Sequence, residues 1–156
     1  MHYAIQHDNL SAVRLLIVEG ASVNVRSRYG MTHLHIAAKH SRADIVKYLL
    51  VKGADINVMH LNGNTPLHFA VRFGQPEMVR LLLKQDAKID LQNKLGETPL
   101  HIAVERGHLS AASLLAANGA DVNIKDNSHE RPIDIARRTR QIHMVDLLRD
   151  VGHKRR

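Results

Sequence analysis

Histidine is the residue type in this sequence with the widest chemical potential, since the chain holds 12 histidines and no cysteine. His33, His35 and His40 lie close enough in sequence to be considered as ligands of one metal ion. His35, however, recurs as His68 and His101 at intervals of 33 residues, which places the copies in successive structural units. Helices of neighbouring units pack about 10 Å apart, too far for the copies to share an ion at about 2 Å. The histidines therefore predict structural or solvent-facing roles, with no metal and no cofactor.

No group of residues has the spacing of a catalytic or phosphate-binding site. There is no Gly-x-Ser-x-Gly nucleophile motif and no serine beside an evident base, and the absence of cysteine removes thiol chemistry. Asp55 and Asp121 belong to a recurring loop motif, which favours a structural role. The glycines also recur at regular positions, whereas a phosphate-binding loop would gather them before one helix. The sequence therefore predicts that the chain is not an enzyme.

The charge of the chain favours an acidic partner or nucleic acid. The chain carries 22 Lys and Arg against 15 Asp and Glu, a net charge of +7, and residues 154–156 are all basic. Only three tyrosines and two phenylalanines are present, whereas proteins that bind single strands stack bases on aromatic rings. Tyr48 and Phe69 fall where helices are expected to face the core, which leaves Tyr29 and Phe73 as exposed rings. Nucleic-acid binding is therefore the second interpretation, after protein binding.

These residues belong to a pattern that repeats along the chain. Gly-Asn-Thr-Pro-Leu-His-Phe-Ala at 63–70 returns 33 residues later as Gly-Glu-Thr-Pro-Leu-His-Ile-Ala at 96–103. Altered copies stand at 30–37 and 131–136. A second motif, Gly-Ala-Asp-Ile-Asn at 53–57, keeps the same register, and its other copies span residues 20–24, 86–90 and 119–123. Two motifs in one register indicate an array of similar units.

The 33-residue period with Thr-Pro-Leu-His-x-Ala resembles the ankyrin repeat, and the resemblance covers nearly the whole chain. It implies an all-α fold, an ankyrin-repeat solenoid of stacked helix-turn-helix units with projecting β-hairpin loops. It also implies that the motif histidines hydrogen-bond between the turns of adjacent repeats. We expect a single ankyrin-repeat domain over residues 1–156. The expected repeats are a truncated first one at about 1–27, complete ones at 28–60, 61–93 and 94–126, and a C-terminal cap at 127–153.

Within a complete unit, the residue types predict two helices. Thr65 can cap the first helix, and Pro66 fits its first turn, where no backbone donor is needed. This helix should run to about Arg72, with a tight turn at Gly74. The second helix carries apolar residues at helical spacing, seen at Ile45, Val46, Leu49 and Leu50. That apolar face should form the core.

Individual units depart from this pattern. Asp86 stands where other units have a helix-ending glycine, so modest backbone strain is expected there. Ala111, Ala112 and Ala116 replace larger apolar residues in the fourth unit, which should bury less area. The first unit lacks its opening half, as in a fragment of a longer protein or a shortened cap. The last helix should end near Gly152, with a frayed tail at 153–156.

Composition favours a folded protein inside the cell. The 44% hydrophobic content suits a packed core, and the lack of cysteine excludes a disulfide scaffold. The sequence shows neither a signal peptide nor an apolar run of about 20 residues. We therefore expect a cytoplasmic or nuclear location, and the resemblance also admits a bacterial effector delivered into a host cell.

The ankyrin resemblance implies a protein-protein interaction module that binds through its concave face, at the hairpin positions and just before each inter-helix turn. The implied partner-binding residues are Arg28, Tyr29, Met31, Lys39 and His40, then Leu61, Asn62, Asn64, Arg72 and Phe73, then Lys94, Leu95, Glu97, Glu105 and Arg106. Apolar residues among them suggest contact, although Leu61 and Leu95 could instead pack under the neighbouring hairpin.

With Arg26 and Lys125, which flank the hairpins, these positions carry a net charge of +5, which favours an acidic partner. We expect a monomer that acts as adaptor, inhibitor or targeting module. The alternatives are a basic array that contacts nucleic acid, or the substrate-recruiting part of a larger enzyme or bacterial effector.

Overall fold

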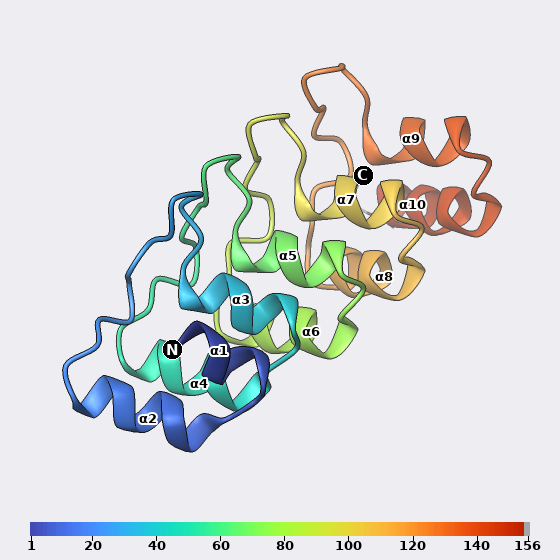
Figure 1. Cartoon of the computed structure of the whole chain (residues 1–156). Helices are drawn as coiled ribbons and strands as arrows, with labels where there is room; N and C mark the ends of the chain where they lie inside the picture. Colours follow the sequence, from blue (N-terminus) through green and yellow to red (C-terminus); the bar gives the residue numbers. More distant parts are fainter. Residues whose placement is uncertain (155–156) are drawn as a thin grey trace.

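The chain folds into a row of helix pairs joined by long loops, as the computed structural model of residues 1–154 shows (Figure 1). The described part contains ten helices and no strand. The helices are α1 (His2–Gln6), α2 (Leu10–Val18), α3 (His33–Lys39), α4 (Ala43–Val51), α5 (Pro66–Arg72), α6 (Pro76–Lys84), α7 (Pro99–Glu105), α8 (Leu109–Ala117), α9 (Pro132–Arg138) and α10 (Ile142–Lys154). The all-α solenoid predicted from the sequence is confirmed.

Each pair repeats the one before it, because the same residues start the same helices. Helices α3, α5, α7 and α9 begin 33 residues apart, and so do α2, α4, α6, α8 and α10. Thr65 begins α5 by accepting a hydrogen bond on its hydroxyl from the His68 amide, and Pro66 occupies the first helical position. The helix runs to Arg72, as expected.

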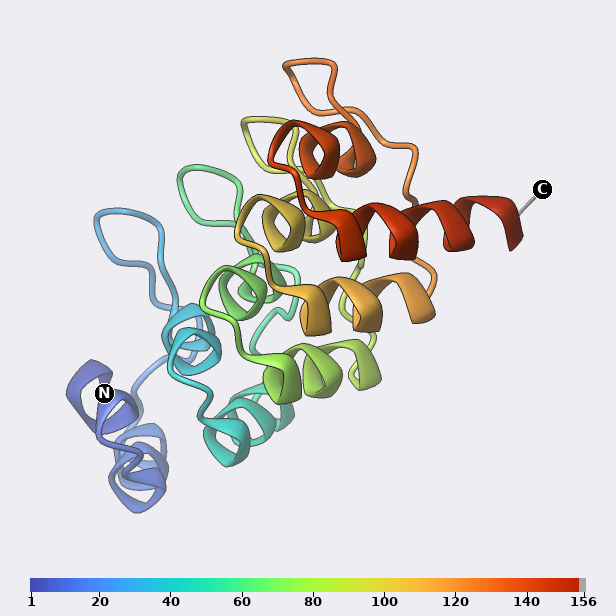
Figure 2. The same ribbon diagram turned by 90° about the vertical axis from the view of Figure 1, so that its right-hand side faces the viewer.

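The helices form two layers, with the loops projecting beyond one of them. Figure 2 shows the odd-numbered helices lying between the loop tips and the even-numbered helices. Neighbouring loops are joined at their tips, where the Lys94 amide donates to the Asn62 carbonyl at 3.0 Å. Each loop is closed by its own short turn and makes one backbone bond of this kind to the next loop, as at Leu61 with Tyr29. The projecting loops therefore form without a strand ladder.

The loop tips pack closely because glycine stands where they meet. Gly63 adopts φ +77°, and a Cβ atom at this position would lie 2.9 Å from the Lys94 nitrogen. His129 is the copy of this residue in the last loop, and it holds φ 62° with a side chain. Asp86 adopts φ 60°, the left-handed conformation expected from its place at a helix end. An L-residue there is mildly strained.

The core runs through the middle of the stack without interruption. Leu49, Leu82 and Leu115 are fully buried on successive even-numbered helices, one repeat apart. Ala111 and Ala112 are also buried, in contact with the same core cluster. The fourth pair therefore keeps the packing of its neighbours with smaller side chains. None of the helices in residues 1–154 has the length and apolarity needed to cross a bilayer.

The first and last pairs differ from the interior. Helix α1 has only five residues, against seven in α3, α5, α7 and α9. Helix α10 has 13 residues, against nine in each of the other even-numbered helices. It runs through Gly152 to Lys154, so the expectation of a helix end near Gly152 and a frayed tail from residue 153 is wrong for these residues. Arg155 and Arg156, the rest of that tail, lie outside the described residues.

Candidate functional site

The motif histidines are structural ties between neighbouring pairs. The backbone N–H of Thr65 donates to Nδ1 of His68 at 3.1 Å, so Nδ1 is unprotonated. Nε2 of His68 must then carry the proton that it donates to the Glu97 carbonyl, 3.2 Å away in the next repeat. His35 repeats this arrangement with Thr32 and the Asn64 carbonyl. The hydrogen bonds between repeats that the resemblance implied are present.

Burial keeps these imidazoles neutral. Desolvation lowers the pKa of His35 and of His68 to about 4, and the carbonyl hydrogen bonds offset only part of that effect. Burial also lowers the pKa of His101, whose Nε2 is 3.2 Å from the Glu130 carbonyl. Because both ring nitrogens of each histidine are engaged, these residues have no lone pair left for a metal or a substrate.

The three histidines first considered as metal ligands do not form a site together. His35 is buried and fully bonded, while His33 and His40 are partly exposed. Within residues 1–154, no cluster of three His, Asp or Glu side chains could hold a metal ion.

The exposed loops and the adjoining helix ends form one face of the molecule, here called the loop face. It comprises residues 28–31, 61–64 and 94–97 of the loops, with residues 39–40, 72–73 and 105–106 at the ends of α3, α5 and α7. Arg28, Tyr29 and Leu61 are exposed, as are Lys94 and Leu95. Met31 and Glu97, at the base of their loops, are half-buried.

A pocket of about 490 Å³ opens at the centre of the loop face, between the second and third loops and helix α5. Six of the residues selected from the sequence line it, namely Asn62, Asn64, Arg72, Phe73, Lys94 and Leu95. The other nine do not line it, namely Arg28, Tyr29, Met31, Lys39, His40, Leu61, Glu97, Glu105 and Arg106. Lys39 contributes indirectly, because its Nζ lies 5.0 Å from the centre of the Phe73 ring.

Three further residues line the pocket and were not predicted from the sequence, namely His60, Phe69 and Asn93. Phe69 was expected to face the core, but it is only half-buried and its ring stacks on that of Phe73. His60 and Asn93 occupy one register position, and each accepts a hydrogen bond from the amide four residues later. That shared loop-closing role, with an acceptor side chain in every repeat, is the signal that would have found them.

The polar groups of the pocket divide into bonded and free ones. Asn64 is nearly buried and its Oδ1 accepts from Nδ2 of Asn93 at 2.9 Å, so it shapes the wall of the pocket. Arg72 and Lys94 make no ion pair with any residue from 1 to 154, and neither side chain donates a hydrogen bond there. Phe73 and Leu95 are 44% and 63% exposed. The pocket thus offers two unpaired cations beside accessible apolar surface.

The carboxylates of the loop face are engaged within the protein. Glu105 lies 3.4 Å from the guanidinium of Arg138, which also contacts Glu130 at 3.1 Å. Glu97 accepts a hydrogen bond on Oε2 from Asn93 at 2.8 Å. Among the flanking cations, Arg26 donates to the Met59 carbonyl, so it supports a loop. The charge available to a partner on this face is therefore positive.

Comparison with known proteins agrees with this architecture. Residues 1–93 and 85–155 match a family model described as ankyrin repeats (3 copies). A search of curated proteins gave no match.

Proposed function

We propose, because this chain belongs to the ankyrin repeat family, that its loop face binds a partner protein through an acidic surface. Ankyrin repeats are in general protein-protein interaction modules. The observation that supports an acidic partner is the contrast between unpaired cations, at Arg72 and Lys94, and carboxylates already bonded within the protein, at Glu97 and Glu105. A carboxylate of the partner would pair with these cations without breaking an ion pair inside the protein.

The apolar residues of the loop face would anchor the same partner. Tyr29 is 65% exposed, and Phe73, whose ring stacks on that of Phe69, is 44% exposed. Exposed aromatic rings held in place by their neighbours supply large contact area at low entropic cost, and such residues dominate binding energy at protein interfaces. We infer a partner segment with an apolar side chain next to one or more carboxylates, seated in the pocket between Asn62 and Leu95.

In this proposal the protein is a non-catalytic, monomeric adaptor, inhibitor or targeting module that works inside a cell. It could also serve as the substrate-recruiting part of a larger enzyme or bacterial effector. The proposed function assigns no catalytic role to any residue of the loop face. The pocket contributes shape, two cations and an aromatic wall, which suffice for recognition.

The test uses a partner captured by the intact protein and measures its affinity for single variants. Replacing Tyr29 or Phe73 with alanine should each weaken binding by about 2 kcal/mol or more. Reversing the charge of Arg28, Arg72 or Arg106 should mainly slow association, and that loss should shrink as salt rises past a screening length of about 8 Å. Far-ultraviolet circular dichroism should stay unchanged, since these side chains are exposed or partly exposed.

Variants on the opposite face provide the control. Lys47, Arg80 and Lys84 are exposed on α4 and α6, in the layer that faces away from the loops. Charge reversal at these positions should leave binding within about 0.5 kcal/mol of the original value. Equal losses from both faces would overturn the assignment. Binding to single-stranded nucleic acid, falling linearly with the logarithm of salt concentration, would instead favour the nucleic-acid alternative.

A further inference from the structure

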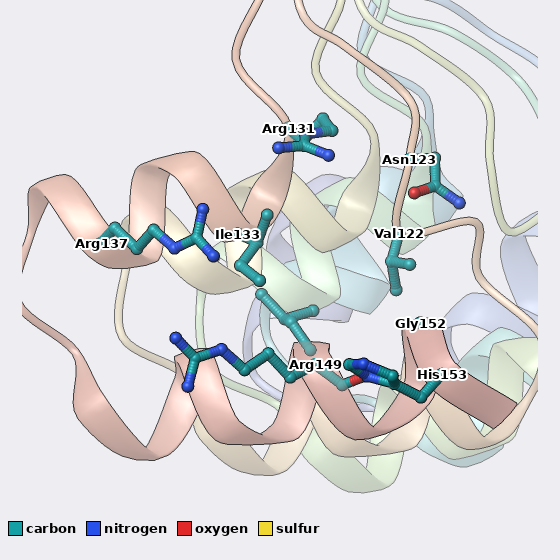
Figure 3. A pocket seen from close by; sticks show the side chains of 9 residues that line it. Val122, Asn123, Arg131, Ile133, Arg137, Arg149, Gly152 and His153 are labelled. Atoms are coloured by element: carbon teal, nitrogen blue, oxygen red, sulfur yellow. The ribbon is translucent and has the colours of Figure 1, made fainter.

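A second pocket lies at the C-terminal end of the stack, away from the loop face. It has a volume of about 290 Å³ and lies between the loop before α9, helix α9 and helix α10. Figure 3 shows Ile133 at its centre, with Val122 and His153 on one side and the guanidinium groups of Arg137 and Arg149 on the other. The guanidinium of Arg131 lies at the upper rim. The pocket thus combines an apolar floor with a cationic border.

The arginines occupy register positions that interior repeats bury or, at the Leu50 and Leu83 copies of Arg149, half-bury. Arg137 is the copy of Val104, which is fully buried, and Arg149 is the copy of Ala116, which is 5% exposed. Arg131 is the copy of Thr98, also fully buried. A further helix pair packed here would have to desolvate guanidinium groups, at a cost of several kcal/mol for each unpaired charge. The surface at this end of the stack therefore suits contact with solvent or with a charged ligand.

The loop before α9 gives independent support. In the interior, a Cβ on Gly96 would lie 2.7 Å from the Asn127 nitrogen of the next loop, so a close neighbour requires glycine. His129 replaces this glycine in the last loop and carries a Cβ where the next loop would approach. Loop and helices alike therefore differ here from the surfaces that interior repeats pack against one another, and the pocket lies on this different surface.

The cations of the pocket are only partly neutralised. Arg131 makes a two-pronged contact with Asp134, at 2.9 and 3.0 Å. Arg137 lies 3.8 Å from the same carboxylate, and Arg149 makes no ion pair with any residue from 1 to 154. One carboxylate thus faces three guanidinium groups, which leaves an excess of two positive charges. Two of these groups, on Arg137 and Arg149, approach the pocket from different helices (Figure 3).

His153 adds a polar group on the opposite side. Its Nδ1 lies 2.7 Å from the Arg149 carbonyl and must donate to it, since a carbonyl oxygen only accepts. The other ring nitrogen, Nε2, is then available to a ligand. This residue reaches the pocket because α10 continues through Gly152, where a Cβ would meet only the Val122 side chain, at 3.9 Å.

We propose that this C-terminal pocket binds a phosphate monoester, with the phosphate held by Arg137 and Arg149. Guanidinium groups match phosphate oxygens through paired N–H donors, and a dianion balances the excess of two charges, which a single carboxylate would not. Ile133 and the aliphatic stems of the arginines would pack against the carbon atoms that carry the phosphate. The pocket has room for one phosphorylated side chain, such as phosphoserine.

The test is a titration of the isotope-labelled full chain, followed by NMR at constant ionic strength. The probes are a short phosphoserine peptide without other acidic residues, the same peptide with serine or aspartate at that position, and inorganic phosphate. We expect saturable shifts at the amides of Arg149 and His153 with the phosphoserine peptide, and binding about tenfold weaker for the aspartate peptide. Inorganic phosphate should compete for the site with lower affinity.

Two variants decide whether the pocket is responsible. Arg149→Gln should weaken phosphopeptide binding about tenfold or more, because it removes the only guanidinium of the pocket without an internal partner. Arg140→Gln is the matched control, since Arg140 is exposed at the same end of the stack but lies outside this pocket. This control variant should weaken phosphopeptide binding by less than about twofold, as expected when only nonspecific electrostatic attraction is reduced. Both variants should melt within a few degrees of the original protein.

Four outcomes would overturn the proposal. They are equal losses from both variants, equal affinity for the aspartate and phosphoserine peptides, binding of inorganic phosphate without the phosphopeptide, and shifts that do not saturate. Because the pocket lies at the end of the stack, none of these outcomes bears on the loop face.

Discussion

The two ends of the stack differ in the residue type or the exposure of side chains at equivalent register positions. Leu16 at the N-terminal end is 37% exposed, whereas its copy Leu148 at the C-terminal end is 2% exposed. Leu15, Val18 and Val25 add further exposed apolar surface at the N-terminal end. The C-terminal end instead presents the guanidinium groups around its pocket.

The difference lies in the residues that each end places on the surface that an interior pair would bury against a neighbour. Each interior pair buries one apolar surface against the pair before it and another against the pair after it, so a terminal pair has one surface left over. The C-terminal end resolves this by exchanging Val and Ala for Arg at positions 137 and 149. The N-terminal end keeps apolar residues at exposed positions, so we expect α1 and α2 to open more readily than α9.

Lowering the pH should cause the largest loss in the free energy of unfolding. The interior repeats should lose stability at a higher pH than the C-terminal pair. His35 and His68 have a folded pKa of about 4 against an ordinary value of 6.5, so the unfolded chain binds protons more tightly. Stability should therefore be complete above pH 6.5 and fall as pH drops towards 4, by about 3 kcal/mol for each residue. Urea unfolding at several pH values measures this.

The C-terminal pair offers a built-in contrast in the acid experiment. Its copy of the motif histidine is Asp134, whose pKa is lowered by its hydrogen bonds with Arg131. The stabilisation from Asp134 should be lost only as the pH falls below its ordinary pKa of 3.8. Amide signals of α9 that disappear at a higher pH than those of α5 would contradict the assignment of the interior histidines.

Matched leucine substitutions should give the next largest difference. Leu148→Ala should destabilise the protein by about 3 kcal/mol, because it removes buried methyl groups and leaves a cavity. Leu16→Ala should cost no more than about 1 kcal/mol, since much of that side chain already contacts water. Thermal or urea unfolding of the two variants measures the comparison, and equal losses would show that the N-terminal leucine is better packed than its exposure indicates.

The glycine of the loop tips allows a similar test of the last loop. Gly96→Ala should cost about 2 kcal/mol, because the new Cβ would lie 2.5 Å from Oδ1 of Asn127 in a left-handed conformation. His129→Ala should change stability by less than about 0.5 kcal/mol, since that residue already carries a Cβ. A costly His129→Ala variant would mean that the last loop has a close neighbour.

Amide exchange should show the smallest difference, at the level of single helices. We expect residues 2–24 to exchange about tenfold faster than α9, and residues 32–104 to be the best protected. Hydrogen exchange followed by NMR or mass spectrometry measures this directly. Uniform protection along residues 1–154 would remove the proposed difference between the ends.

Much of the fold was predictable because each repeat carries the same residue types at the same helix starts and turns. Threonine, proline and histidine at fixed spacing set the start of α5 and α7, and the altered copies at 30–37 and 131–136 keep the same register. The path of the last helix was not predictable in this way. Gly152 stands where Gly53 and Gly119 adopt positive φ, yet α10 passes through it, because a glycine permits a helix end without requiring one.

The candidate site was predictable only in part, since register assigns a position but not the direction of a side chain. Family resemblance selected Asn62, Phe73 and Lys94, which do line the central pocket. It also selected residues that lie elsewhere on the loop face, such as Glu105, which is tied to Arg138. Phe69 was misplaced because a ring at a core-facing position can still tilt outwards when His60 packs beside it.

The spacing of the ties between repeats has a consequence for how such a protein can evolve. The hydrogen bonds that join neighbouring units, such as His68 to Glu97, Lys94 to Asn62 and Gln141 to Val104, connect residues 29 to 37 positions apart. Duplication or deletion of one 33-residue segment would therefore disturb contacts only at the seam and restore the same ties beyond it. The array can therefore lengthen or shorten by whole interior repeats without any change to the first and last helix pairs described above.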